Sequence, residues 1–197
     1  GHTRLGPNFW CPVFLGATCP PEAERFDTRS GLAPLNGTDS EGYALNIRWD
    51  LNPAWTFRSI TAYRESDSRN NIDFDTTPAR IADVASLYFD DQTSEELQFV
   101  YEGDGKLNGV IGAYYFDGSA GGQVKNIFLN GLAGFGITEG FTDTESFALF
   151  GDGSYAINSA LTFNFGLRAT QEKKSASVFI GGYSDDTFSR LIAVSSD

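Results

Sequence analysis

Apolar and polar residues alternate with a period of two through most of the chain from residue 41 onward. In the segment 161–168 the two kinds separate completely, with Leu161, Phe163, Phe165 and Leu167 on one side and Thr162, Asn164, Gly166 and Arg168 on the other. Successive side chains of a β-strand point to opposite faces, so this period predicts a strand with one apolar and one polar face. A fold made of such strands must cover the apolar face either with a second protein layer or with lipid.

The same pattern predicts six strands, at residues 41–50, 54–66, 92–102, 107–117, 143–156 and 160–171. They follow one another as strand, short turn, strand, long loop, three times over. The long connections are residues 67–90 and 118–140, residues 1–40 form an extended loop region, and residues 173–197 begin another loop or strand. The expected fold is all-β, an antiparallel sheet of three hairpins. Strands of about ten residues and this asymmetry of connections suit a transmembrane β-barrel.

Composition narrows the possible partners. The chain carries a formal net charge of −12 at pH 7, and this argues against nucleic-acid binding, which requires a basic surface. No run of residues approaches the roughly 18 apolar positions of a membrane-spanning helix. Barrel strands give much weaker hydropathy signals, so a membrane barrel remains open.

Three features favour lipid on the apolar side and a lumen on the polar side. Aromatic residues lie close to the short turns, where membrane–water interfaces attract them: Trp49, Trp55, Tyr101 and Tyr155. Small residues that would leave costly voids in a packed core interrupt the apolar side: Ser59, Thr61, Gly109, Gly151 and Gly153. Polar residues at mid-strand positions are expected to face a lumen: Arg48, Arg58, Arg64, Glu96, Gln98, Asp152, Asn164 and Arg168.

Three segments resemble successive hairpins of TonB-dependent outer-membrane receptors. They read "WTFRSITAYRE", "SEELQFVYEGDGKLNGVIGAYYFD" and "ESFALFGDGSYAINSALTFNFGLRATQEKK", and the resemblance covers about residues 40 to 175 in the order of the family. The chain departs from the family pattern at Gly109, where the family often has Trp, at Gly153, a common Val position, and at Phe99. These departures are expected to thin the lipid-facing surface.

The resemblance implies a barrel of about 22 strands with an N-terminal plug domain, surrounded by outer-membrane lipid in the bacterial cell outer membrane. It implies import of a scarce, large solute such as a ferric siderophore, driven by TonB, and neither an enzyme activity nor a cofactor. Other cargoes of the family are cobalamin and oligosaccharides. Six strands cannot close such a barrel, so we expect an interior fragment, with the plug, the remaining strands and the TonB-contacting segment elsewhere in the protein.

Motifs for catalysis are weak. His2 is the only histidine, and it belongs to no convincing Ser–His–Asp arrangement. The stretch "GDGSY" lacks the spacing of a nucleophile elbow, and "GDGK" is a hairpin turn without the Walker spacing. The acidic stretch with Glu65, Asp67, Asp73 and Asp75 could bind calcium, although its spacing is not that of an EF-hand. A solvated acidic loop is the interpretation that the sequence favours, and the residues that bind cargo are not identifiable.

The two cysteines, Cys11 and Cys19, lie in one short segment, "CPVFLGATCP". A disulfide that closes this loop is the favoured interpretation in an oxidising compartment, and two free thiols are the alternative. No further Cys or nearby His completes a tetrahedral metal site.

Two other fold hypotheses remain at this stage. One is a secreted or surface β-sandwich that binds a ligand such as a carbohydrate, with the Phe-rich side buried between two sheets. The other is a small self-contained barrel, which would need about eight strands. Solubility without detergent would distinguish the sandwich.

Overall fold

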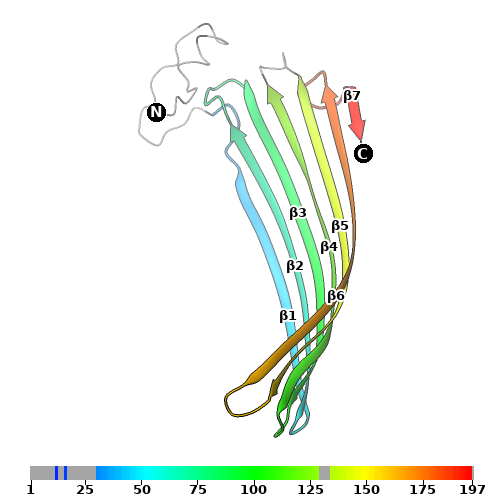
Figure 1. Ribbon diagram of the computed structural model, residues 1–197. Helices are drawn as coiled ribbons and strands as arrows, with labels where there is room; N and C mark the ends of the chain where they lie inside the picture. The colour runs from blue at the N-terminus through cyan, green and yellow to red at the C-terminus, as the bar shows by residue number, and fades with distance from the viewer. Residues whose placement is uncertain (1–11, 13–15, 17–29, 129–133, 197) are drawn as a thin grey trace, which may run out of the picture.

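The fold is a single antiparallel sheet of seven strands in chain order (Figure 1). The computed structural model describes residues 30–128 and 134–196, together with Pro12 and Gly16. The strands are β1 (Asn36–Asn52), β2 (Trp55–Asp73), β3 (Ala82–Glu102), β4 (Leu107–Phe128), β5 (Phe135–Ala156), β6 (Thr162–Tyr183) and β7 (Leu191–Ser196). The predicted all-β, antiparallel barrel segment is confirmed.

Within the described ranges, no helix is long and apolar enough to cross a membrane.

The connections at one end of the sheet are tight turns, and this end is the lower one in Figure 1. They are residues 53–54, 103–106 and 157–161. In the first turn the side-chain oxygen of Asn52 accepts hydrogen bonds from the backbone N–H groups of Ala54 (3.0 Å) and Trp55 (3.1 Å). Asn158 accepts a similar bond from the N–H of Ala160 at 2.9 Å. Asn and Pro at these positions therefore reverse the chain, as expected from their turn preferences.

The strands reach further toward the other end than the alternation predicts. Of the residues expected as loops, 67–73, 82–90, 118–128 and 135–140 are strand, and 74–81 form the connection between β2 and β3. The expected start of a loop or strand at 173–197 contains the second half of β6 and all of β7. Both faces of the sheet are polar or mixed in this half, so the sequence shows no period there. Continuous pairing such as Asp67 with Phe89 holds these segments in the sheet instead.

The register keeps all odd-numbered side chains of β1–β6 on one face and all even-numbered ones on the other. Every paired position joins odd with odd or even with even, except Asn52 with Trp55 beside an irregularity in β1. We call these surfaces the odd face and the even face. Because the side-chain period of a strand is two, one consistent register carries a face across six strands.

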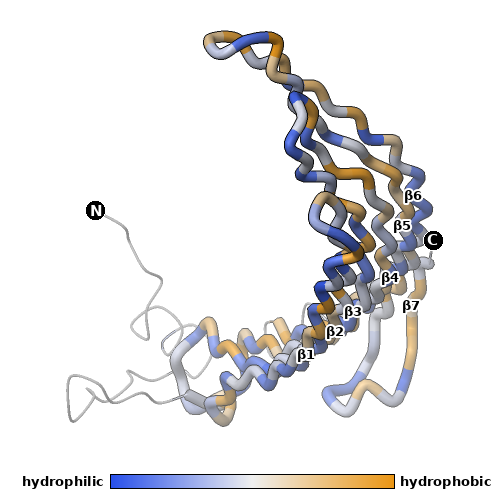
Figure 2. The backbone as a smooth tube through the Cα atoms, turned by 90° about the horizontal axis from the view of Figure 1, so that it is seen from below, coloured by the Kyte–Doolittle hydropathy of each residue, from blue (hydrophilic) through white to orange (hydrophobic). Residues whose placement is uncertain are grey.

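Neither face is covered by a second layer among the described residues, and the sheet is curved (Figure 2). Large apolar side chains of the odd face are exposed, Leu167 by 81% and Trp49 by 64%. Apart from Ala148, the buried apolar residues lie at the end with the longer connections: Ile81, Ala82, Ile127 and Ile137. A β-sandwich would instead bury the odd face against another sheet.

Candidate functional surfaces

The odd face is apolar in the half of the sheet near the tight turns. We call this region the apolar band; it consists of the odd-numbered residues of 43–51, 55–63, 97–101, 107–115, 147–155 and 163–169. On four of the six strands the band is nine residues long, which corresponds to about 27 Å along the strand. A tilted strand needs about 9–11 residues to cross the hydrocarbon core of a bilayer. The number of residues in the band therefore matches what a strand needs to cross the hydrocarbon core of a bilayer.

The hydroxyl residues that interrupt the band donate hydrogen bonds to the carboxylate of Glu95. Ser59 donates a hydrogen bond to Glu95 Oε1 at 2.8 Å, and the hydroxyl of Thr61 donates to Glu95 Oε2. Thr61 and Glu95 are direct partners in the register of β2 and β3. Two of the small residues that interrupt the apolar side therefore donate hydrogen bonds to a charged group at the edge of the band.

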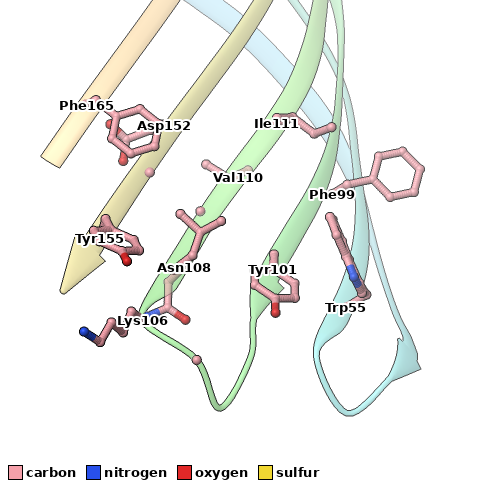
Figure 3. A pocket seen from close by; sticks show the side chains of 14 residues that line it. Trp55, Phe99, Tyr101, Lys106, Asn108, Val110, Ile111, Asp152, Tyr155 and Phe165 are labelled. Atoms are coloured by element: carbon pink, nitrogen blue, oxygen red, sulfur yellow. The ribbon is translucent and has the colours of Figure 1, made fainter. Parts of the chain in front are cut away.

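Three of the aromatic residues near the turns line a hollow in the odd face (Figure 3). The rings of Trp55 and Tyr101 lie 5.0 Å apart between centroids. Together with Tyr155 they line a hollow of about 770 Å³. Gly109 and Gly153, two of the departures from the family pattern, are partners in the register and line this hollow. Trp49 lies one strand away, opposite Phe57. An interfacial role for these aromatic residues stays a prediction.

Aromatic rings cover several of the glycines. A Cβ atom at Gly153 would lie 2.6 Å from Cζ of Phe165, and one at Gly112 would meet the ring of Phe150 as well as the carbonyl oxygen of Leu97 at 2.6 Å. A Cβ at Gly140, in contrast, would meet nothing within 4 Å. At the covered positions, glycine leaves the room in which a ring of the neighbouring strand lies flat on the sheet.

Beyond the apolar band, the odd face becomes strongly acidic. This acidic belt consists of Asp39, Glu41, Glu65, Asp67, Asp91, Asp117, Asp143 and Glu145. The register places Glu41 opposite Glu65, and Glu65 opposite Asp91. Lys173 is the cation paired with the belt, directly opposite Glu145. The alternation predicted Glu41, Glu65, Asp117, Asp143 and Glu145 in strands and Asp39 and Asp67 in loops, but it did not bring these residues together as a belt.

The eight residues predicted to face a lumen all belong to the even face: Arg48, Arg58, Arg64, Glu96, Gln98, Asp152, Asn164 and Arg168. Arg48 and Arg58 are direct partners in the register, and the Nε of Arg48 donates to Asp50 Oδ1 at 3.0 Å. The guanidinium of Arg168 lies 5.6 Å from the ring centroids of Tyr114 and Phe150. Charged side chains on a face that holds few large apolar ones require water or a polar partner. Their lumen-facing role stays a prediction.

The connection between β2 and β3 brings Asp73, Asp75 and Asp83 together, with one oxygen of each within 4.8 Å of the others. Glu65 and Asp67, the other calcium candidates from the sequence, lie on β2 opposite Asp91 and Phe89 and outside this cluster. Sequence reasoning missed Asp83 because it lies ten positions after Asp73 and meets it only through the hairpin register. The pKa of Asp83 is raised above its ordinary value, because burial outweighs the opposing effect of the hydrogen bond from Arg80.

The connection between β6 and β7 is organised by Asp185. Its Oδ1 accepts hydrogen bonds from the N–H and hydroxyl of Thr187, at 3.1 and 2.5 Å, and from the N–H of Ser189 at 3.0 Å. Its Oδ2 accepts from the N–H of Arg190 at 2.9 Å. Chiefly because of the Thr187 bonds, the pKa of Asp185 falls to about 2. The turn also places Phe188 against Phe135 and Tyr183.

Cys11 and Cys19 lie outside the described residues, so the disulfide stays a prediction.

Comparison with known proteins identifies the family. A model of the "TonB dependent receptor-like, beta-barrel" family matches residues 9–191. Among curated proteins, none matches the chain. The crystal structure of the ferric yersiniabactin uptake receptor FyuA from Yersinia pestis is similar to 76% of this chain, with 14% identity and a TM-score of 0.49. The match covers 26% of the FyuA chain, so this chain spans about a quarter of that receptor. The chain belongs to the TonB-dependent receptor-like β-barrel family.

Proposed function

We propose that this chain is part of the barrel wall of a TonB-dependent receptor that imports a scarce, large solute across the bacterial outer membrane. A ferric siderophore is the cargo that we put first, because it is the usual cargo of the family that the chain resembles. The observation that carries the proposal is the family match over residues 9–191. A curved sheet with an apolar band on its odd face and charged residues on its even face supports it.

In this proposal, lipid covers the apolar band, and Trp49, Trp55, Tyr101 and Tyr155 lie at the membrane interface. The even face lines the lumen, where its charges meet water and the plug domain. The remaining barrel strands pair with β1 and with the part of β6 that β7 does not cover, because open strand edges in hydrocarbon leave backbone groups without partners. The chain transports and does not catalyse, with energy supplied through TonB.

Uptake by cells tests the transport proposal. A strain that lacks the receptor gene would be supplied with a panel of radiolabelled ferric siderophores, cobalamin and an oligosaccharide under iron limitation. We expect one ferric siderophore to depend on both the receptor and TonB. Dependence of another cargo on both would retain the receptor and change the solute, whereas unchanged uptake of every compound, or uptake independent of TonB, would contradict the proposal.

Cysteine accessibility tests the assignment of the two faces. In a full-length receptor with Cys11 and Cys19 replaced by Ser, Asn164→Cys on the even face would be compared with its neighbour Phe163→Cys on the odd face. A water-soluble maleimide requires the thiolate, which forms in water and not in hydrocarbon. We expect the cysteine at 164 to react and the one at 163 to stay protected in intact membranes. The reverse order of reactivity would overturn the assignment.

A further inference from the structure

The carboxylate cluster at the β2–β3 connection is the most unusual electrostatic feature of the described residues. Asp73 ends β2, Asp75 lies in the connection, and Asp83 is the second residue of β3. Asp75 is 0% exposed and Asp83 is 2% exposed. Asp73 and Asp83 are direct partners across the two strands. Like charges directly opposite one another destabilise a sheet, and burial removes the water that would screen them.

Hydrogen bonds from backbone and side-chain donors stabilise part of the negative charge of this cluster. Asp75 accepts four hydrogen bonds, from the N–H and hydroxyl of Thr77 and from the N–H groups of Ile81 and Ala82. Its two oxygens each receive two donors, so they are saturated. The position of this side chain is therefore fixed by the connection that it organises.

Asp73 and Asp83 keep acceptor capacity. Asp73 Oδ1 accepts from the N–H groups of Asp75 and Thr76, whereas its Oδ2 accepts one bond, from the N–H of Gly31 at 2.9 Å. Asp83 Oδ2 accepts from Nε of Arg80 at 3.0 Å. Asp83 Oδ1 is buried and has no hydrogen-bond partner among the described residues. A buried carboxylate oxygen without a partner is costly, and a bound cation would remove that cost.

We propose that Asp73 and Asp83 bind a calcium ion at the loop end of the first hairpins, with Asp75 adding a third negative charge beside it. All three groups are carboxylates, which suit a hard cation and not a metal that prefers nitrogen or sulfur. Their oxygens lie within 4.8 Å of one another, about twice a calcium–oxygen distance of roughly 2.4 Å. Magnesium needs shorter, near-octahedral contacts and keeps more of its water.

The alternative is a purely internal balance of charge. Arg80 pairs with Asp83, and Lys125 lines a small cavity of about 60 Å³ with both of them. Among the described residues, these two cations leave a net negative charge beside three carboxylates, and Arg80 is the one that is bonded to the cluster. Asp73 and Asp83 have few free lone pairs, so we expect weak calcium binding. The dissociation constant should be on the order of 0.1–1 mM, as in extracellular calcium modules.

A bound ion would connect three segments of the chain. Asp73 holds the N–H of Gly31 ahead of β1, Asp75 holds the connection 74–81, and Asp83 begins β3. Arg80 lies in this connection with its side chain 46% exposed, where trypsin could reach it once the loop opens. Calcium should therefore protect Arg80 from cleavage, because proteolysis requires local unfolding.

The test uses the full-length receptor in detergent, stripped with EGTA and titrated with calcium chloride in a calorimeter, with trypsin cleavage after Arg80 followed in parallel. We expect saturable binding and slower cleavage with calcium in the wild type. Asp83→Asn should weaken calcium binding at least about tenfold and abolish the protection, since it removes the charge of one ligand. Asp67→Asn, on the same face but on β2 and outside the cluster, should behave as the wild type.

Two results would overturn the proposal. One is a wild-type receptor whose calcium titration matches that of Asp83→Asn, which would assign the site to Arg80 and Lys125 alone. The other is an equal loss of calcium binding in Asp67→Asn, which would indicate general screening of the acidic surface. If Asp83→Asn does not fold, Asp73→Asn must give the same loss of binding and protection.

Discussion

The two halves of the odd face share the same strands but carry opposite chemistry. Near the tight turns, β5 presents Phe147, Leu149 and Tyr155, whereas further along the same strand it presents Asp143 and Glu145. The backbone pairing is continuous through both halves. The two halves therefore differ in their side chains and not in their backbone pairing. One half fits a surface in contact with hydrocarbon, and the other requires water or cations.

The largest expected loss of stability comes from a substitution that places a charge in the apolar half of the odd face. We expect Leu149→Arg to destabilise the full-length receptor in phospholipid vesicles by about 2–4 kcal/mol, the cost of Arg near the midplane of the bilayer on a lipid-facing strand. Unfolding by urea, followed by heat-modifiable mobility on gels, measures this change.

Asp143→Arg is the matched control, on the same strand and face but in the acidic belt. It should change stability by less than about 0.5 kcal/mol, as an exposed substitution does. Equal costs for the two variants would show that the boundary between the halves is not a boundary between lipid and water.

The second effect concerns glycines on the even face. A Cβ at Gly112, in the turn-end half, would meet the ring of Phe150 and the carbonyl oxygen of Leu97, whereas one at Gly140, in the loop-end half, meets nothing. We expect Gly112→Ala to cost about 1–3 kcal/mol because the backbone oxygen cannot move aside. Gly140→Ala should be neutral or slightly stabilising in the same urea titration. A neutral Gly112→Ala would mean that the ring does not cover this glycine.

The third prediction tests where the lipid boundary lies at the edge of the apolar band that is farther from the tight turns. Thr61→Val keeps the shape of the side chain and removes one of the two hydroxyl donors to Glu95. We expect a loss of about 1.5–3 kcal/mol if Glu95 lies in hydrocarbon, and about 1 kcal/mol or less if water replaces the donor. Thr93→Val, on β3 opposite Tyr63, is the control. The size of the loss therefore locates Glu95 relative to the lipid boundary.

The smallest effect is local and depends on pH. Hydrogen bonds lower the pKa of Asp185 from 3.8 to about 2, so its contribution to the order of turn 184–190 is complete above about pH 4 and is lost as the pH falls through 2. Amide exchange of Ser189 and Arg190 should therefore accelerate between pH 4 and 2, after correction for intrinsic rates. In Asp185→Asn the acceleration should disappear; its persistence would attribute it to another group.

The same comparison explains which parts of the fold could be predicted from the sequence. The turn-end half has one apolar and one polar face, so the alternation at Leu161–Leu167 and its counterparts located every long strand and both faces. In the loop-end half the odd face carries Asp67 and Asp91, and no period distinguishes strand from loop there. Cross-strand hydrogen bonds form these segments, and such bonds depend on partners far away in the sequence.

The candidate sites divide in the same way. The positions of the polar residues in the alternation were enough to predict that they share the even face. The cluster with Asp83 could not be predicted in this way, because it depends on the pairing of Asp73 with Asp83 across β2 and β3 and on a connection shaped by Asp75. The apposition of Gly109 and Gly153 likewise appears only when β4 and β5 are paired.

The parity of the register sets how this chain can tolerate changes of length. One residue inserted in the middle of any of the six long strands would exchange the two faces from that point onward, so that Arg58 or Arg168 would point where leucines now do. Two inserted residues would preserve the faces and only shift the height of the band. Single insertions or deletions should therefore survive in the connections or at an irregularity such as that between Asp50 and Asn52, and mid-strand changes should occur in pairs.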